Sequence, residues 1–175
     1  MEKREHTTYL SAGFAVSKAN LKIEFRGRLD SLCAEVVELQ VRFQKNGHVE
    51  AVEDLEEVRT KLCDLMTREA TGEACGELFL QGLSPDELRE RSHHPAKYFG
   101  IGHIRAHHTM GEISAGLNTL RTRVRETELS ACRAFETKEE PERPDIIKFL
   151  NRLSSAIYVL TYKYLPAGYD KTIRF

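Results

Sequence analysis

The feature that most constrains this chain is the recurrence of apolar side chains every three or four residues along four long segments. This spacing places the apolar residues on one face of an α-helix, so each segment predicts an amphipathic helix. The predicted helices span residues 21–44, 49–71, 111–137 and 144–164. Residues that end or begin helices separate the segments: Asn46-Gly47 follows the first, Gly72 follows the second, and Pro144 opens the last.

Runs of β-branched and aromatic residues with a period of two are not found, so the sequence predicts no strand. We therefore expect an all-α fold, an up-and-down bundle of four to five helices. The fifth is a short helix that begins at Ser84, where the sequence SPDE is typical of a capping box with proline at the first helical position. An irregular, histidine-rich insert, residues 72–110, precedes the third long helix, and connections of this length are typically functional or disordered.

Five of the seven histidines lie in this insert. They are His93, His94, His103, His107 and His108. His103 and His107 are four residues apart, which is a metal-ligand spacing if the segment is helical. Because no carboxylate or cysteine completes an obvious set, we assign no metal site from the sequence. Metal binding, a cover over a bound ligand and a simple polar loop stay open as interpretations.

Length and charge narrow the classes of function. A chain of 175 residues fits one domain, which we assign to residues 1–175. A formal net charge of -1 argues against general binding to nucleic acid or to a membrane surface. No apolar run approaches the ~18 residues that span a bilayer, and no apolar leader is expected. The four cysteines lie far apart, so we expect reduced thiols in a cytoplasmic protein.

The stretch LRTRVRETE in the third long segment holds three arginines and two glutamates. On a helix, Arg121, Arg125 and Glu128 line up on one face. The two arginines repel each other unless a carboxylate or phosphate lies between them, and guanidinium groups bind both in bidentate geometry. The alternative is a solvated face, on which Glu128 pairs with Arg125. On that face Glu126 would likewise pair with Arg123.

The last segment places polar residues inside an apolar helix. The stretch FLNRLSS brings Asn151 and Arg152 into this helix, with two serines close behind. Asparagine and serine are poor residues for a helix interior, and a buried amide requires hydrogen-bond partners. A hydrogen bond between helices and a contact with a ligand both account for Asn151.

In this order the motifs resemble those of the cobalamin adenosyltransferases of the propanediol- and ethanolamine-utilisation types. The matching positions are Lys18; Gly27 and Asp30 in G-x-x-D; Arg121, Arg125 and Glu128 in R-x-x-x-R-x-x-E; and Asn151, Arg152, Leu153 and Ser154 in N-R-L-S. The resemblance covers residues 8–164. It is closest to the ethanolamine-utilisation type, through the stretches RTRVRETE, RPDI, LNRLSS, LSPDEL and SHHP.

The resemblance implies an enzyme that transfers the 5′-deoxyadenosyl group of ATP to the cobalt of reduced cobalamin and releases triphosphate. It also implies Mg²⁺ on the triphosphate and a homo-oligomer, a trimer in much of the family, with ATP at the subunit interface. Neither nucleic acid nor a membrane is implied as a partner. Location in the cytoplasm is expected, and location within a bacterial microcompartment stays open.

The resemblance also assigns roles to residues. It implies catalytic roles for Arg121, Arg125 and Asp30, and ATP-binding roles for Thr8, Lys18, Arg125, Glu128 and Asn151. Arg125 and Lys18 would contact the triphosphate, and Arg121 would pair with Asp30 across a subunit interface. Tyr98 and Phe99 in the insert would contact the corrinoid and exclude the lower ligand of cobalt, or they would simply anchor the insert to the bundle.

The chain departs from the family pattern near its first residues. The propanediol type has a glycine-rich phosphate loop, G-D-x-G-x-T, whereas the matching stretch here, KREHTT, lacks the glycines and keeps only Thr8 in place. The metal-binding histidine and clustered cysteines of the ethanolamine type are not found in this sequence. Two rival hypotheses therefore stay open: a non-catalytic relative that binds a corrinoid or nucleotide, and a histidine-rich metal-binding bundle.

Overall fold

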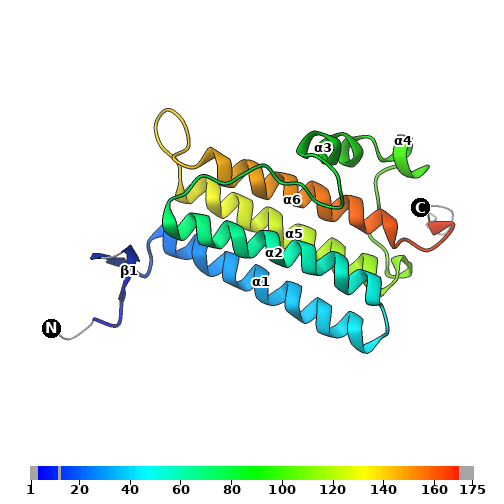
Figure 1. Ribbon diagram of the computed structural model, residues 1–175, viewed down its shortest axis with the longest axis horizontal. Coiled ribbons are helices and arrows are strands. Elements are labelled where there is room, and N and C mark those ends of the chain that lie inside the picture. Colours follow the sequence, from blue (N-terminus) through cyan, green and yellow to red (C-terminus); the bar gives the residue numbers. More distant parts are fainter. Residues whose placement is uncertain (1–3, 12, 170–175) are drawn as a thin grey trace.

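The computed structural model describes residues 4–11 and 13–169, and helices dominate them. Four long helices lie side by side as a bundle (Figure 1): α1 (Leu21–Lys45), α2 (Val49–Thr71), α5 (Glu112–Ala134) and α6 (Pro144–Lys163). Helix α5 packs against α1 and α6, and α1 packs against α2. The insert, rather than a short turn, joins α2 to α5, so these two helices run in the same direction (Figure 1). The predicted all-α bundle is confirmed.

The helix ends follow the local signals in the sequence. The Asn20 side chain accepts a hydrogen bond of 2.9 Å from the backbone N–H of Lys22 and so caps α1. Gly72 ends α2 with a positive φ of 80°, a conformation that glycine adopts without strain. Helix α5 ends at Ala134, three residues before the predicted end, because the Phe135 carbonyl accepts a hydrogen bond from the loop N–H of Glu142 at 2.7 Å.

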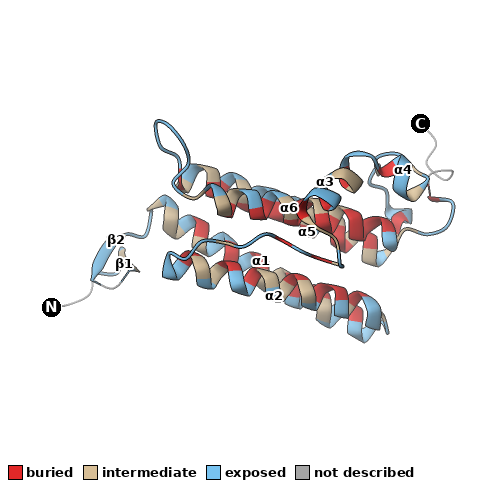
Figure 2. Ribbon diagram, turned by 45° about the horizontal axis from the view of Figure 1, so that its top comes forward, coloured by how far each residue is buried: buried red, intermediate tan, exposed pale blue. Residues whose placement is uncertain are grey.

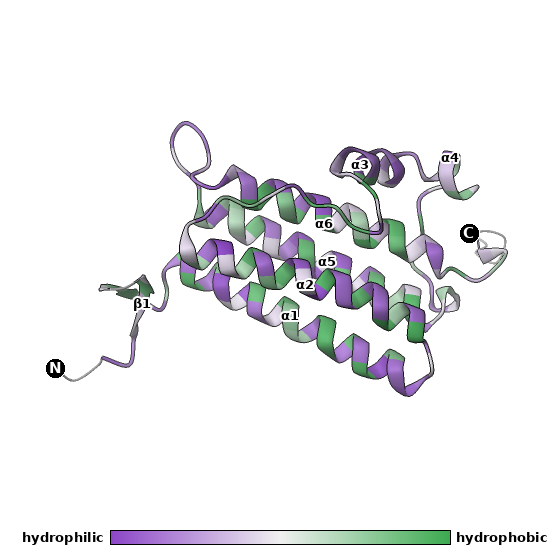
Figure 3. Cartoon of the chain, in the orientation of Figure 1, coloured by the Kyte–Doolittle hydropathy of each residue, from purple (hydrophilic) through white to green (hydrophobic). Residues whose placement is uncertain are grey.

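The apolar faces of the four long helices meet in one core (Figures 2 and 3). The buried residues of α1 are spaced alternately by four and three positions, which is the spacing from which this helix was predicted. They are Phe25, Leu29, Leu32, Val36, Leu39 and Phe43. Burial of each large side chain contributes roughly 2 kcal/mol, which is why packing rather than helix propensity holds the bundle together. No helix in the described part of the chain is both long and apolar enough to cross a membrane.

Helices α1 and α5 approach each other closely at Gly116. A Cβ atom at this position would lie 2.9 Å from Leu39 Cδ2 and 3.1 Å from Phe43 Cζ. Glycine therefore allows the side chains of Leu39 and Phe43 to pack directly against the α5 backbone, and a larger residue would require these side chains to shift. This contact fixes the position of the arginine-bearing face of α5 relative to α1.

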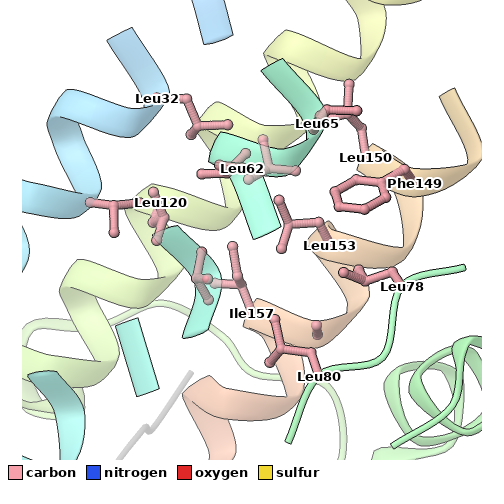
Figure 4. Close-up of a cluster of buried hydrophobic side chains, with 14 of the residues drawn as sticks. Leu32, Leu62, Leu65, Leu78, Leu80, Leu120, Phe149, Leu150, Leu153 and Ile157 are labelled. Carbon is pink, nitrogen blue, oxygen red and sulfur yellow. The ribbon is translucent and has the colours of Figure 1, made fainter. Parts of the chain in front are cut away.

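The insert is attached to the bundle at its beginning. Leu78 and Leu80 are buried, and both point toward α6 (Figure 4). A tight turn follows, in which Leu80 and Leu83 exchange backbone hydrogen bonds and the Glu57 carboxylate accepts the N–H of Gln81 at 3.1 Å. The short helices α3 (Pro85–His93) and α4 (Pro95–Phe99) and the 3₁₀ turn η1 (His108–Met110) come next. The predicted capping box at Ser84 is confirmed.

The expectation of no strand is wrong at the beginning of the chain. Strands β1 (Thr7–Ser11) and β2 (Phe14–Ser17) form an antiparallel hairpin that lies off one end of the bundle (Figure 1). Both strands are short, and neither has a buried face, so the alternation of polar and apolar residues is weak. Tyr9 and Phe14 are exposed at 61% and 59%. The stretch that matches the phosphate loop of the family, residues 3–8, leads into β1 and supplies its first two residues, and residue 3 lies outside the described residues.

Candidate functional site

The arginine-rich stretch forms one face of α5 (Glu112–Ala134), as its spacing predicts. Arg121 is half-buried, and its guanidinium lies 5.3 Å from the centre of the Tyr158 ring on α6. It donates to Asn118 Oδ1 at 3.1 Å and 3.3 Å. Burial lowers the pKa of Arg121 below its ordinary value; the Tyr158 contact opposes this, and the like charge of Arg125 lowers it further. Arg121 is therefore a positive charge held in place without a carboxylate.

Arg125 lies one turn further along the same face and is exposed. Its side chain makes no hydrogen bond or ion pair with residues 4–11 or 13–169. The pair with Glu128 that would make this a solvated face is therefore not formed. Two guanidinium groups one turn apart, neither neutralised by a carboxylate within the described chain, make the face attractive to an anion.

Glu128 instead reaches across to α6. Asn151 donates through Nδ2 to Glu128 Oε1 at 2.8 Å, and its Oδ1 accepts from Arg152 NH1 at 2.7 Å. The hydrogen bond between helices, one of the two explanations for Asn151, is thus present, although Asn151 is exposed rather than buried. The orientation of its amide is fixed by these two partners.

The remaining charges of the stretch follow the ordinary pattern of a solvated helix. Arg123 donates to Glu126 at 2.9 Å, as predicted, and also lies 3.7 Å from Glu35 on α1. These ion pairs of Arg123 lie on a different face of α5 from Arg121 and Arg125. The stretch LRTRVRETE thus carries one arginine with two carboxylate partners and two arginines with none in the described chain. This difference separates a structural face of the helix from a candidate binding face.

The other residues implied for ATP lie apart from this face. Asp30 is exposed on α1 and forms no ion pair with Arg121 inside the described chain, so their pairing across an interface stays a prediction. Thr8 lies in β1 opposite Val16, and Lys18 follows β2 with its side chain exposed. The structure brings Arg121, Arg125, Glu128 and Asn151 together but leaves the three others separate.

The aromatic pair of the insert lies at the far end of α6 from the hairpin. Phe99, at the end of α4, stacks on Tyr162 of α6 with ring centres 4.5 Å apart and an angle of 13° between the planes. Tyr98 is 38% exposed and contacts Lys97, whose ammonium lies 4.8 Å from the ring centre. Phe99 thus anchors the insert to the bundle, whereas the neighbouring Tyr98 ring faces charged groups at the surface.

Tyr158 was not identified from the sequence, and it connects the two parts of the site. Its ring lies beneath Arg121, and its hydroxyl lies 3.0 Å from that of Tyr162, on which Phe99 stacks. A signal was available, because Tyr158 follows Asn151 by seven residues and so shares its face of α6. The aromatic character of Tyr158 made it resemble an ordinary core position.

The histidines of the insert do not converge on a metal site. Across residues 4–11 and 13–169, no three side chains of histidine, cysteine, aspartate or glutamate are arranged to hold a metal ion. The rings of His107 and His108 contact each other at a tilt of 39°, whereas His103 contacts Tyr158. The spacing of four residues does not place His103 and His107 on one helical face, because this segment is irregular rather than helical.

Comparison with known proteins identifies the family. A family model described as cobalamin adenosyltransferase matches residues 2–164. The chain is 38% identical over 160 residues to the corrinoid adenosyltransferase EutT of Escherichia coli, which covers 91% of this chain and 58% of the relative. It is 37% identical over 161 residues to EutT of Salmonella typhimurium, with 91% and 59% covered. The chain therefore spans less than two thirds of the length of these relatives, and by the extent of the family match it belongs to the cobalamin adenosyltransferases.

Proposed function

We propose that this chain is an ATP:corrinoid adenosyltransferase. The observation that carries the proposal is the face of α5 on which Arg121 and Arg125 lie one turn apart without a carboxylate partner in the described chain, beside the Glu128–Asn151 hydrogen bond. Corrinoid adenosyltransferase is also the name of the relatives from two enteric bacteria.

The reaction transfers the 5′-deoxyadenosyl group of ATP. The electron pair of cobalt(I) attacks C5′, a cobalt–carbon bond forms, and the C5′–oxygen bond breaks. Triphosphate leaves with the electron pair of the broken C5′–oxygen bond, so the negative charge that develops on it must be stabilised. Arginine and lysine side chains, with Mg²⁺ on the phosphate oxygens, are suited to this task. The reactive centre belongs to the corrinoid, and the protein supplies position and environment.

The residues divide the task along α5 and α6. Arg125 contacts the triphosphate, because its guanidinium is exposed and unpaired in the described chain. Arg121 is held rigidly by Tyr158 and Asn118 and shapes the ATP site. Glu128 and Asn151 orient the nucleotide from their fixed positions. Thr8 and Lys18, at the hairpin, add the remaining phosphate contacts in place of the glycine-rich loop.

The insert supplies the corrinoid side of the site. Phe99 and Tyr98 place aromatic surface at one end of the bundle, which suits the apolar face of a macrocycle. An aromatic ring against the lower face of the corrin excludes the lower cobalt ligand and so makes cobalt(II) easier to reduce. If Phe99→Ala leaves the reduction of bound cobalt(II) unchanged, this role is wrong.

We further propose that residues 1–175 act as one domain within a homo-oligomer, a trimer, in the cytoplasm. The exposed carboxylate of Asp30 on α1 supports this, because Arg121 has no carboxylate partner within the described chain. A partner subunit's carboxylate would complete the pair at an interface. The oligomer size in solution, with and without Asp30→Ala, tests this part of the proposal.

An anaerobic assay tests the proposed function. The protein is mixed with ATP, Mg²⁺ and chemically reduced cob(I)alamin, and the visible spectrum of the corrinoid is followed. Formation of adenosylcobalamin that Arg125→Ala abolishes supports the enzyme. Arg123→Ala is the matched control, because Arg123 lies on the same helix but pairs with Glu126 and Glu35. Binding of ATP or cobalamin without turnover would instead favour a non-catalytic carrier.

A further inference from the structure

The hydroxyl of Tyr158 has three hydrogen-bond partners where the insert meets α6. The backbone N–H of Ile104 donates to it at 3.0 Å, the Tyr162 hydroxyl lies at 3.0 Å, and His103 Nδ1 lies at 3.2 Å. Tyr162 also contacts the carbonyl oxygen of Gly102, at 2.8 Å. Each hydroxyl has only one proton, so the arrangement decides which group donates in every contact.

The protons can be assigned in sequence. A carbonyl oxygen only accepts, so the proton of Tyr162 goes to Gly102. Burial, together with Tyr158, raises the pKa of Tyr162 above its ordinary value, which keeps that proton in place. All the contacts of this set are hydrogen bonds only when Tyr158 in turn donates its own proton to the Tyr162 oxygen. With that proton used, Tyr158 can only accept from His103, so the proton of the neutral imidazole lies on Nδ1.

The same assignment leaves Nε2 of His103 without a proton. In an imidazole ring the two nitrogens point in different directions, so Nε2 faces away from Tyr158. It makes no hydrogen bond within the part of the chain that the structure describes. His103 lines a surface pocket of about 490 Å³ together with His93, His94 and Lys97. Nε2 is therefore the ring nitrogen of His103 that is available to a ligand in this pocket, and the contact of Nδ1 with Tyr158 fixes the tautomer of the ring.

A second histidine of this pocket has the same tautomer for an independent reason. His93 Nδ1 lies 2.8 Å from the carbonyl oxygen of Arg89, which can only accept, so Nδ1 is the protonated nitrogen. Both rings therefore carry their proton on Nδ1, which contacts the backbone in His93 and Tyr158 of α6 in His103. The Nε2 atoms are left as acceptors, so a ligand group that contacts them must be a hydrogen-bond donor.

We propose that His103 Nε2 accepts a hydrogen bond from a carboxamide N–H on the rim of the bound corrinoid. The inference rests on the proposed function and extends it to a residue that orients the substrate. A corrin ring has apolar faces and a rim of primary amides. Here the Phe99 ring stacks on Tyr162, whose hydroxyl contacts that of Tyr158, the partner of His103. Apolar surface with a few well-placed polar atoms is the usual design of such sites.

The tautomer can be measured without any substrate. Long-range ¹H–¹⁵N NMR spectra of the histidine rings in the ligand-free protein separate protonated from unprotonated ring nitrogens. We expect His103 as the Nδ1–H form. Tyr158→Phe, which removes only the hydroxyl, should return the ring to a mixture dominated by Nε2–H. Finding Nε2–H in the unaltered protein overturns the proposal, whatever the activity of the protein.

Binding then tests the role of the lone pair. Cob(II)alamin is titrated anaerobically in the presence of ATP, and the affinity of ATP is measured separately. His103→Ala should weaken cob(II)alamin binding ~tenfold, which is the loss of one good hydrogen bond. His103→Gln, whose amide oxygen replaces Nε2, should restore most of the affinity. His108→Ala, an exposed histidine of the same insert, is the control.

The outcomes separate the two proposals. Unchanged cob(II)alamin affinity in His103→Ala overturns this inference but leaves the adenosyltransferase proposal standing. A loss of ATP affinity alone would mean that the donor is the adenine amino group, which also overturns it. No cob(II)alamin binding by the unaltered protein would remove the proposed function itself, while the NMR result would still report on the tautomer.

Discussion

Two regions of this molecule hold arginine in opposite ways. At the start of α6, Arg143 donates to both oxygens of Asp145, at 3.0 Å and 2.9 Å, and to the carbonyl oxygen of Glu73 at 2.8 Å. Asp145 also accepts the backbone N–H of Cys75 at 2.8 Å. The bidentate pair joins the beginning of the insert to α6, and every charge in it is neutralised.

In the middle of α5 the opposite holds. Arg125 is exposed without a partner in the described chain, and Arg121 is held by a ring and an amide rather than by a carboxylate. The comparison teaches that a functional arginine is recognised by what its surroundings leave unsatisfied. In the sequence both regions place arginine close to carboxylate residues. Only the structure distinguishes the arginine that stabilises the fold from the arginines that are available to bind an anion.

The variant Arg125→Ala tests this difference between the two regions most strongly. We expect kcat/KM for adenosylcobalamin formation to fall about 100-fold, because a charge that stabilises the leaving triphosphate is lost. The free energy of unfolding should change by less than about 0.5 kcal/mol, since no contact within the described chain is removed. Urea unfolding and steady-state kinetics check the two parts, and a stability loss comparable to that of an Arg143 variant would contradict the distinction.

Asp145→Ala should have the opposite effect, a loss of stability with little change in the affinity for substrate. Its removal leaves Arg143 half-buried without a partner and frees the N–H of Cys75, so we expect a loss of about 2 kcal/mol in the free energy of unfolding. Because Asp145 lies at the start of α6, before Asn151, KM for ATP should stay within about twofold. Urea unfolding at pH 7 measures the first effect; a variant as stable as the unaltered chain would show that the pair is dispensable.

Low pH should also lower the free energy of unfolding, because it protonates the Asp145 carboxylate. Burial alone would raise the pKa of Asp145, but the hydrogen bonds from Arg143 and the Cys75 N–H outweigh it and hold this pKa well below the ordinary 3.8. A carboxylate with a lowered folded pKa stabilises the fold above its unfolded pKa and loses that contribution as the pH falls through the folded value. The stability difference between the unaltered chain and Asp145→Asn should therefore narrow below about pH 4.

We expect the smallest effect from a substitution that gives the unpaired Arg125 a carboxylate partner. Leu129 is 63% exposed and lies four residues after Arg125, so Leu129→Glu offers Arg125 an intrahelical carboxylate. We expect the helix to gain about 0.3 kcal/mol and the affinity for ATP to fall ~fivefold, because the anion now competes with the new glutamate. Leu129→Gln is the uncharged control, and equal ATP affinity in both variants would contradict the proposed role of Arg125.

The sequence was sufficient for the long helices and insufficient for the contacts between them. A period of 3.6 residues gave the core face of α1 residue by residue, because burial of that face is what the periodicity records. The hairpin was missed because exposed strands such as Phe14–Ser17 have no buried face to leave a pattern. The alignment of Arg121 with Arg125 followed from helix geometry, but the Tyr158 contact depends on how α5 and α6 cross.

Arg26 joins the hairpin to the bundle. Its NH1 donates to the carbonyl oxygen of Leu10 and its Nε to Glu69, each at 2.7 Å. With few other attachments described, the hairpin can open while the four helices stay folded. In hydrogen exchange its amides should therefore exchange at a rate set by local opening, orders of magnitude faster than those of α5 and α6. Binding of a nucleotide at Thr8 and Lys18 would appear first as protection of these amides.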